Sequence, residues 1–104
     1  MFGTLKSMLG GNSDAAEEAL KNGAVIIDVR TPMEFSGGHV AGSKNIPLNE
    51  LQSSLKNVPK SKAIIFCCAS GARSGSATQF AKSQGYEAYN GGPWTRVNRM
   101  VGEK

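Results

Sequence analysis

The 104-residue sequence has little of what marks a membrane or secreted protein: it has no long apolar run and only two cysteines. A membrane-spanning helix needs about 20 mainly apolar residues, so we expect no membrane association. The segment from Met1 to Leu9 lacks the charged start and sustained apolar run of a signal peptide. We therefore expect a cytoplasmic chain, in a compartment where thiols are kept reduced.

The charged residues do not indicate a nucleic-acid partner. The net charge is +4, but the basic residues are scattered. Lys56, Lys60 and Lys62 form only a loose group, and Arg96 and Arg99 lie near the end. Nucleic-acid binding usually involves a dense basic surface or interleaved aromatic residues. We therefore expect no nucleic-acid partner, whereas a small anionic substrate is compatible with this charge.

The two cysteines, Cys67 and Cys68, are adjacent in the sequence. A disulfide between neighbouring residues is strained, and a structural zinc site needs four ligands, whereas His39 is the one histidine. We expect no structural disulfide, no metal and no cofactor. Two free thiols with a packing or a reactive role remain, and a transient oxidised pair stays open.

Short apolar runs rich in β-branched residues alternate with segments of helical spacing. Strands are predicted at Ala24–Ile27, Ala63–Cys67 and Tyr86–Tyr89, with at most a short strand at Asn45–Pro47, and helices at Ser13–Leu20, Thr31–Phe35, Leu48–Leu55, Ser74–Gln84 and from Pro93 onward. Gly91 to Pro93 is predicted to form a turn. This alternation favours an α/β protein with a parallel sheet covered on both faces. The length fits one domain over residues 1–104, with a core at about 13–101.

The segment most suited to chemistry follows the second predicted buried strand. Sites in open parallel sheets form at the carboxyl ends of strands, and Cys68 lies there, followed by a small, polar loop. The amides of Ala69 to Ser74 are placed to surround an anion. Such surroundings lower the pKa of a thiol from ~8.5 to ~3.5–7.5. Arg73 adds a fixed positive charge, so Cys68 is predicted to be a nucleophile.

Each of these residues also has a structural interpretation. Cys68 is alternatively a buried core cysteine, although the small, polar residues after it favour a reactive role. Cys67 ends the apolar strand and is predicted to point into the core. Arg73 either contacts substrate or forms an ion pair with Asp28 or Glu34, and both roles stay open.

Two blocks of the sequence resemble the rhodanese family. The first runs from Ile27 to Pro47 and contains Asp-Val-Arg, Glu-Phe and Gly-His-Val-Ala-Gly in that order. The second is Cys68-Ala69-Ser70-Gly71-Ala72-Arg73-Ser74, which is similar to the family's Cys-x-x-Gly-x-Arg-Ser loop. Gly91-Gly92 followed by Trp94 fits the family's last turn and helix. The resemblance covers about Ser13 to Val101.

The resemblance implies a rhodanese-like α/β fold, with a parallel five-stranded sheet and helices on both faces. It implies a sulfurtransferase in which Cys68, as a persulfide, passes sulfane sulfur from thiosulfate or a persulfide donor to cyanide or a thiol. A thioredoxin-like or sulfur-relay protein is a further candidate acceptor. The substrate-binding residues would be Ala69, Ser70, Gly71, Ala72, Arg73 and Ser74, and the supporting residues Asp28, Arg30, Glu34 and His39.

One departure from the family pattern concerns the donor. Ala69 stands where many members have Arg or Lys, so thiosulfate is expected to bind weakly and another persulfide becomes the expected donor. Two other functions stay open. Phosphatases of related fold have one residue more between cysteine and arginine than the four here, Ala69 to Ala72, which ranks phosphatase below sulfurtransferase. A non-catalytic sulfur relay for a partner enzyme is the second.

Overall fold

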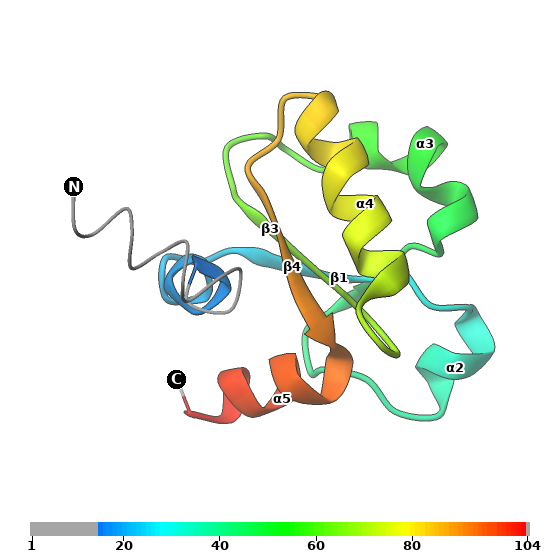
Figure 1. The fold of residues 1–104 in the computed structure, drawn as a ribbon, viewed down its shortest axis with the longest axis vertical. Helices are drawn as coiled ribbons and strands as arrows, with labels where there is room; N and C mark the ends of the chain where they lie inside the picture. Colours follow the sequence, from blue (N-terminus) through cyan, green and yellow to red (C-terminus); the bar gives the residue numbers. More distant parts are fainter. Residues whose placement is uncertain (1–14, 104) are drawn as a thin grey trace.

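The computed structural model describes residues 15–103, which form a parallel sheet with helices on both faces (Figure 1). The strands are β1 (Val25–Asp28), β2 (Lys44–Asn45), β3 (Ile64–Cys68) and β4 (Ala88–Pro93), in the order β2-β1-β3-β4. The expectation of five strands is therefore wrong for this part of the chain, which has four. Outside these four strands, residues 15–103 form helices, turns and segments without regular secondary structure.

The helical segments lie close to where the apolar spacing predicts them. They are a helix over residues 15–21, α2 (Pro32–Ser36), η1 (Leu48–Glu50), α3 (Leu51–Ser54), η2 (Leu55–Asn57), α4 (Ala72–Ser83) and α5 (Trp94–Glu103). The single helix predicted over the three leucines is split into two 3₁₀ turns around one α-turn. The predicted caps Ser13 and Asp14 lie outside the described residues. Among the helices described, none has the length and apolarity to cross a membrane.

Helix α2 begins where its sequence predicts. The Thr31 hydroxyl accepts the Glu34 amide, and the Glu34 carboxylate in turn accepts the Thr31 amide at 3.0 Å. This reciprocal arrangement satisfies amides that have no partner within the helix. Pro32 occupies the first turn, where its missing N–H costs nothing. The short helix is therefore held in place by its cap and directs Glu34 toward the rest of the molecule.

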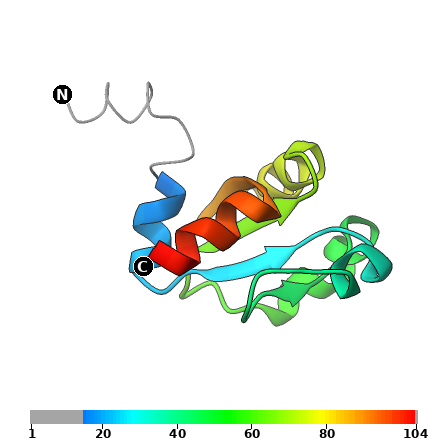
Figure 2. The same ribbon diagram turned by 90° about the horizontal axis from the view of Figure 1, so that it is seen from below.

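The sheet separates two apolar cores, because side chains of successive strand residues point to opposite faces. Figure 1 shows α3 and α4 on one side of the sheet, and α5 and the helix over residues 15–21 on the other. Figure 2 shows these last two helices next to each other. The first core includes Ile27, Ile64, Phe66, Cys68 and Ala77. The second includes Ile26, Ile65, Cys67, Val97 and Met100.

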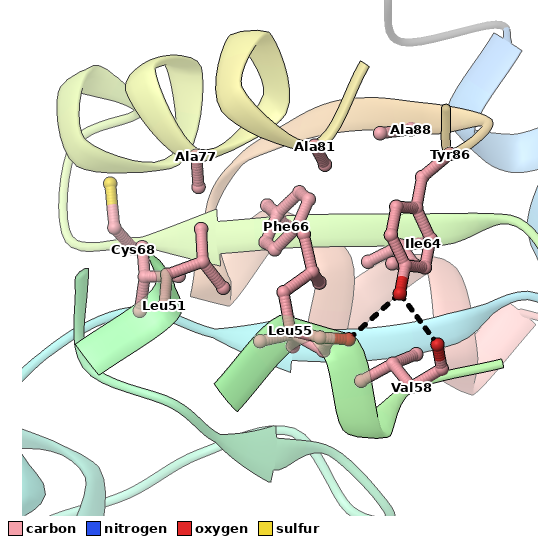
Figure 3. Close-up of a cluster of buried hydrophobic side chains, with 12 residues drawn as sticks. Leu51, Leu55, Val58, Ile64, Phe66, Cys68, Ala77, Ala81, Tyr86 and Ala88 are labelled. Carbon is pink, nitrogen blue, oxygen red and sulfur yellow. Dashed lines mark hydrogen bonds between the residues drawn. The ribbon is translucent and has the colours of Figure 1, made fainter. Parts of the chain in front are cut away.

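Tyr86 ties the helical segment 48–57 to the sheet in the first core. Its hydroxyl donates toward the backbone carbonyls of Leu55 and Val58, at 2.8 and 2.7 Å (Figure 3). A buried phenol needs such partners, since an unpaired buried polar group costs stability. Figure 3 also shows Cys68 at one end of this core, with its sulfur turned toward α4.

The predicted turn at Gly91 to Pro93 is wrong, because these residues continue strand β4. The pairing of β3 with β4 shifts register between Phe66 and Cys67, which accommodates the extra residue. Gly91 lies where no side chain fits: a Cβ there would be 2.6 Å from Val97 Cγ2 and 2.8 Å from Ile65 Cγ2. The absence of a side chain therefore lets β4 continue beneath α5.

Substituting Gly91→Ala should destabilise the fold by about 1–3 kcal/mol, because the added methyl overpacks a filled core. The matched control is Gly102→Ala in α5, where a Cβ meets nothing within 4 Å. Alanine there should change the stability by less than about 0.5 kcal/mol, since Gly102 is exposed and lies next to the last residue of the helix. Urea unfolding of the three proteins measures both changes. Equal stability of Gly91→Ala and the native protein would contradict the close packing.

Candidate active site

The sulfur of Cys68 lies in a cradle of backbone amides. Cys68 is the last residue of β3, and α4 begins at Ala72, two residues earlier than predicted. Between them Gly71 takes a left-handed conformation, φ +107°, which glycine adopts readily. This turns the amides of Gly71 and Ser74 toward Sγ, at 3.0 and 3.3 Å, and places Ser74 Oγ 3.3 Å from Sγ.

These contacts favour the ionised sulfur. Burial by itself raises the pKa of the Cys68 thiol. Hydrogen bonds from the Ser74 hydroxyl and from the amides of Ser74, Gly71 and Ser70 outweigh it and lower the pKa from its usual value of 9.0. The side chain has 0% exposure, as the core-cysteine interpretation expects, but its sulfur is in polar contact. The loop can therefore hold a negative charge on a sulfur that water does not reach.

Cys67 has the opposite surroundings. It belongs to the second core, whereas Cys68 belongs to the first, so the two thiols lie on opposite faces of β3. Burial, followed by the charge of Asp28, raises the pKa of Cys67 to about 12. The predicted core position of Cys67 is therefore confirmed. An oxidised Cys67–Cys68 pair would require β3 to lose its extended conformation.

Arg73 forms an ion pair with Glu34 on α2. Its two terminal nitrogens reach the two carboxylate oxygens at 2.8 and 3.0 Å. The Arg73 guanidinium, followed by the Thr31 amide, lowers the pKa of Glu34 to about 2. Of the two carboxylates considered from the sequence, Glu34 rather than Asp28 is the partner. A substrate contact by Arg73 stays a prediction.

A hollow of about 290 Å³ opens beside Arg73. It lies between the segment after β1, the segment after β2 and the start of α4, and is lined by Val29, Thr31, Pro47, Leu48, Asn49 and Arg73. Arg73 is one residue before Ser74, whose amide binds the Cys68 sulfur. A second hollow, of about 250 Å³, is lined by residues that include Lys60 and Tyr86, and so lies toward the other end of the strands.

Asp28 and Arg30 form a buried pair on the face opposite Cys68. Asp28 lies beside Cys67 in the strand register. Its carboxylate accepts the Arg30 side chain at 2.8 and 3.0 Å, and Arg30 also donates to the Gly38 carbonyl at 2.7 Å. The guanidinium lies over the Trp94 ring, 4.9 Å from its centre. These residues join β1, the segment after α2 and α5, which is a structural arrangement.

The other predicted residues are dispersed around the loop. Ala69, Ser70 and Ala72 are exposed on its outer side. His39 stacks on Phe35 at the surface, with ring centres 3.7 Å apart. The structure thus brings Gly71 and Ser74 to the sulfur and directs Arg73 to Glu34. Within residues 15–103, no group of three or more His, Cys, Asp or Glu side chains is placed to hold a metal ion.

Two asparagines that are not among the predicted site residues, Asn45 and Asn90, hold this end of the sheet together. Asn45 donates to the carbonyls of Asp28 and Arg30, at 3.0 and 2.9 Å. Asn90 contacts the Ser74 hydroxyl at 2.6 Å and the Gly71 carbonyl at 3.1 Å. An asparagine directly before Gly91-Gly92 indicates only a turn, so the sequence carried no signal for the role of Asn90.

Comparison with known families decides the relationship. The sequence profile of the rhodanese-like domain matches residues 12–92. The chain belongs to the rhodanese-like domain family. The resemblance in its two sequence blocks is thereby confirmed, and the fold is a rhodanese-like α/β fold.

Relatives of this rhodanese-like domain include named enzymes. It is 33% identical to the thiosulfate sulfurtransferase GlpE of Ectopseudomonas mendocina, over 72% of this chain and 70% of that protein. It is 41% identical to the uncharacterised protein YqhL of Bacillus subtilis over 64% of this chain, but spans only 54% of that relative. The solved structure described as "rhodanese with anions from E. coli" is 32% identical, with a TM-score of 0.66, over 70% of this chain and 89% of that one.

The lowered pKa of Cys68 predicts a pH dependence of alkylation. The thiolate reacts, so the rate with iodoacetamide should be high above a midpoint below pH 9.0 and fall as the pH drops through it. Cys67 should stay unmodified in the folded protein over this pH range, because its pKa of about 12 keeps it a neutral thiol. Peptide mass spectrometry after timed quenching distinguishes the two sites. A Cys68 midpoint at or above 9.0 would contradict the cradle.

The buried and the exposed ion pair should differ in their effect on stability. Asp28→Ala leaves the Arg30 guanidinium buried without its partner and should cost about 3–5 kcal/mol. Glu34→Gln breaks an exposed pair and should cost much less. Urea unfolding at neutral pH measures both changes. Equal losses would contradict the assignment of Asp28-Arg30 as the buried pair.

The Glu34 pair has its own pH signature. Its folded pKa of about 2 lies below the ordinary 4.5, so its stabilisation is present above pH 4.5 and is lost as the pH falls toward 2. The stability difference between Glu34→Gln and the native protein should therefore shrink over that range.

Proposed function

We propose that this rhodanese-like domain is a sulfurtransferase that carries sulfane sulfur as a persulfide on Cys68. The observation that carries the proposal is the Cys68 sulfur accepting the amides of Gly71 and Ser74, at 3.0 and 3.3 Å. Its relative GlpE is named a thiosulfate sulfurtransferase, which supports the reaction class. Backbone amides that hydrogen-bond to Sγ favour the thiolate, which is the form of cysteine that attacks a sulfur donor.

In the loading step the Cys68 thiolate attacks the outer sulfur of the donor. With thiosulfate, a bond forms between Sγ and that sulfur while the bond to the sulfonate sulfur breaks, and sulfite leaves with the electron pair. The outer sulfur then carries the negative charge as a persulfide, and the loop amides are placed to stabilise that charge. An acceptor thiolate or cyanide attacks the outer sulfur and returns Cys68 to a thiolate. Ionisation of the thiol replaces a separate general base.

Access to the sulfur is part of the proposal, because Cys68 has no exposed surface. A donor reaches Sγ only if the loop after Cys68, in which Ala69 and Ser70 are exposed, moves. The methyl group of Ala69 offers no charge to attract thiosulfate. This favours a persulfide donor, whose recognition does not depend on a cation at that position.

The geometry around Arg73 argues against phosphatase activity. A phosphate cradle uses the charge of an arginine to stabilise the phosphoryl oxygens, but the charge of Arg73 is already paired with the Glu34 carboxylate. The amides that remain suit a single sulfur. A sulfur relay for a partner protein would use the same Cys68 persulfide. It would differ from the enzyme in releasing the sulfur only to that partner and not to small-molecule acceptors.

The test is to incubate the protein with thiosulfate or a small-molecule persulfide and measure the intact mass. Native protein should gain one sulfur atom on Cys68, more completely with the persulfide donor. Cys68→Ser should gain none. Cys67→Ala is the matched control, and should load as the native protein does, because its side chain lies in the other core.

Further measurements distinguish the enzyme, the relay and the phosphatase. Rapid release of the sulfur to cyanide or a free thiol favours the enzyme, whereas a stable persulfide that only a protein acceptor discharges favours the relay. Hydrolysis of an aryl phosphate with no mass gain on Cys68 would overturn the proposal, and so would loss of loading in Cys67→Ala.

A further inference from the structure

Asn90, on β4, makes three hydrogen bonds around the cradle. Its Oδ1 accepts the Ser74 hydroxyl at 2.6 Å and the Gly92 amide at 2.9 Å. Its Nδ2 donates to the Gly71 carbonyl at 3.1 Å. An amide N–H only donates and a carbonyl only accepts, so the Gly92 and Gly71 contacts together fix which end of the Asn90 side chain faces Ser74.

This orientation decides where the hydrogen of the Ser74 hydroxyl lies. The hydroxyl has one hydrogen and two neighbours, Asn90 Oδ1 at 2.6 Å and Cys68 Sγ at 3.3 Å. Since Oδ1 can only accept, the hydrogen lies toward Asn90. The Ser74 oxygen is then free to accept from the Cys68 thiol, which gives the neutral sulfur a complete set of partners.

Ionisation changes these partners. When Cys68 loses its proton, the thiolate becomes an acceptor that the Ser74 hydroxyl can reach by rotating about its own C–O bond. Asn90 Oδ1 keeps the Gly92 amide when that happens. One hydrogen is therefore shared between two acceptors, an amide oxygen and a sulfur, and the stronger acceptor holds it.

We propose that Asn90 is a positioning residue that competes with the Cys68 sulfur for the hydrogen of the Ser74 hydroxyl, and so sets how readily that sulfur ionises. The inference rests on the proposed function in taking Cys68 as the reactive sulfur. It concerns ionisation alone, so a failure of sulfur loading would overturn the proposed function and leave this inference standing.

Two variants of Asn90 should shift the ionisation of Cys68 in opposite directions. Asn90→Asp keeps the shape, makes a stronger acceptor for the Ser74 hydrogen and loses the N–H that holds the Gly71 carbonyl, so the alkylation midpoint should rise by about one pH unit. Asn90→Leu has a similar shape without an acceptor. It should release the hydrogen to the thiolate and lower the midpoint by about half a unit. The measurement is the pH profile of Cys68 alkylation in the full chain.

The Ser74→Ala background separates this mechanism from a general effect of charge or packing. Without the hydroxyl, the shift caused by Asn90→Asp should fall to less than half, and that caused by Asn90→Leu should vanish. A rise in the midpoint with both single variants would mean that Asn90 only supports the loop, and would overturn the proposal. An undiminished Asn90→Asp shift in the Ser74→Ala background would also overturn the proposal. This second comparison does not need Asn90→Leu, so it tests the proposal even if that variant does not fold.

Discussion

Strand β3 is buried along its whole length, and the alternation of its side chains determines the environments of its two cysteines. Its last two residues are cysteines, and alternation assigns one to each core. Cys67 points to the face that holds the Asp28 carboxylate, which opposes a second negative charge. Cys68 points to the face where the loop returns, and receives two amide N–H groups. A shift of one residue in the register would exchange the two environments.

Both arginines of the recognised sequence blocks are already paired with carboxylates. Arg30 is held by Asp28 within the second core, and Arg73 by Glu34 near the surface. The groups that lower the pKa of Cys68 are therefore uncharged donors of the loop, the Ser74 hydroxyl and backbone amides. Such donors are fixed by the backbone and need little reorganisation as charge develops. This explains how a site with Ala69, rather than a cation, beside its cysteine can still favour a thiolate.

The sequence was most informative where one residue type has one strong structural preference. Thr31 and Pro32 predicted the start of α2, and the β-branched run before Cys67 predicted the central strand and its two buried faces. The sequence was least informative where the outcome depends on tertiary packing. Gly91, Gly92 and Pro93 are residue types typical of turns, but they continue strand β4. Gly91 fits there because it has no side chain to collide with Ile65 and Val97. The partner of Arg73 could be narrowed to two carboxylates, and only the position of α2 selects Glu34.

Asn90 lies between the cradle around Cys68 and the second core. Asn90 is followed directly by Gly91, which packs without a side chain against Val97 of α5. Gly91 thus packs against residues of the second core, while the side-chain amide of the preceding residue, Asn90, points to the face where α4 lies. That amide holds the Gly71 carbonyl and the Ser74 hydroxyl on the other side of the sheet. Asn90 thus connects the packing around α5, through its neighbour Gly91, with the Ser74 hydroxyl and the Gly71 backbone, both of which contact the Cys68 sulfur.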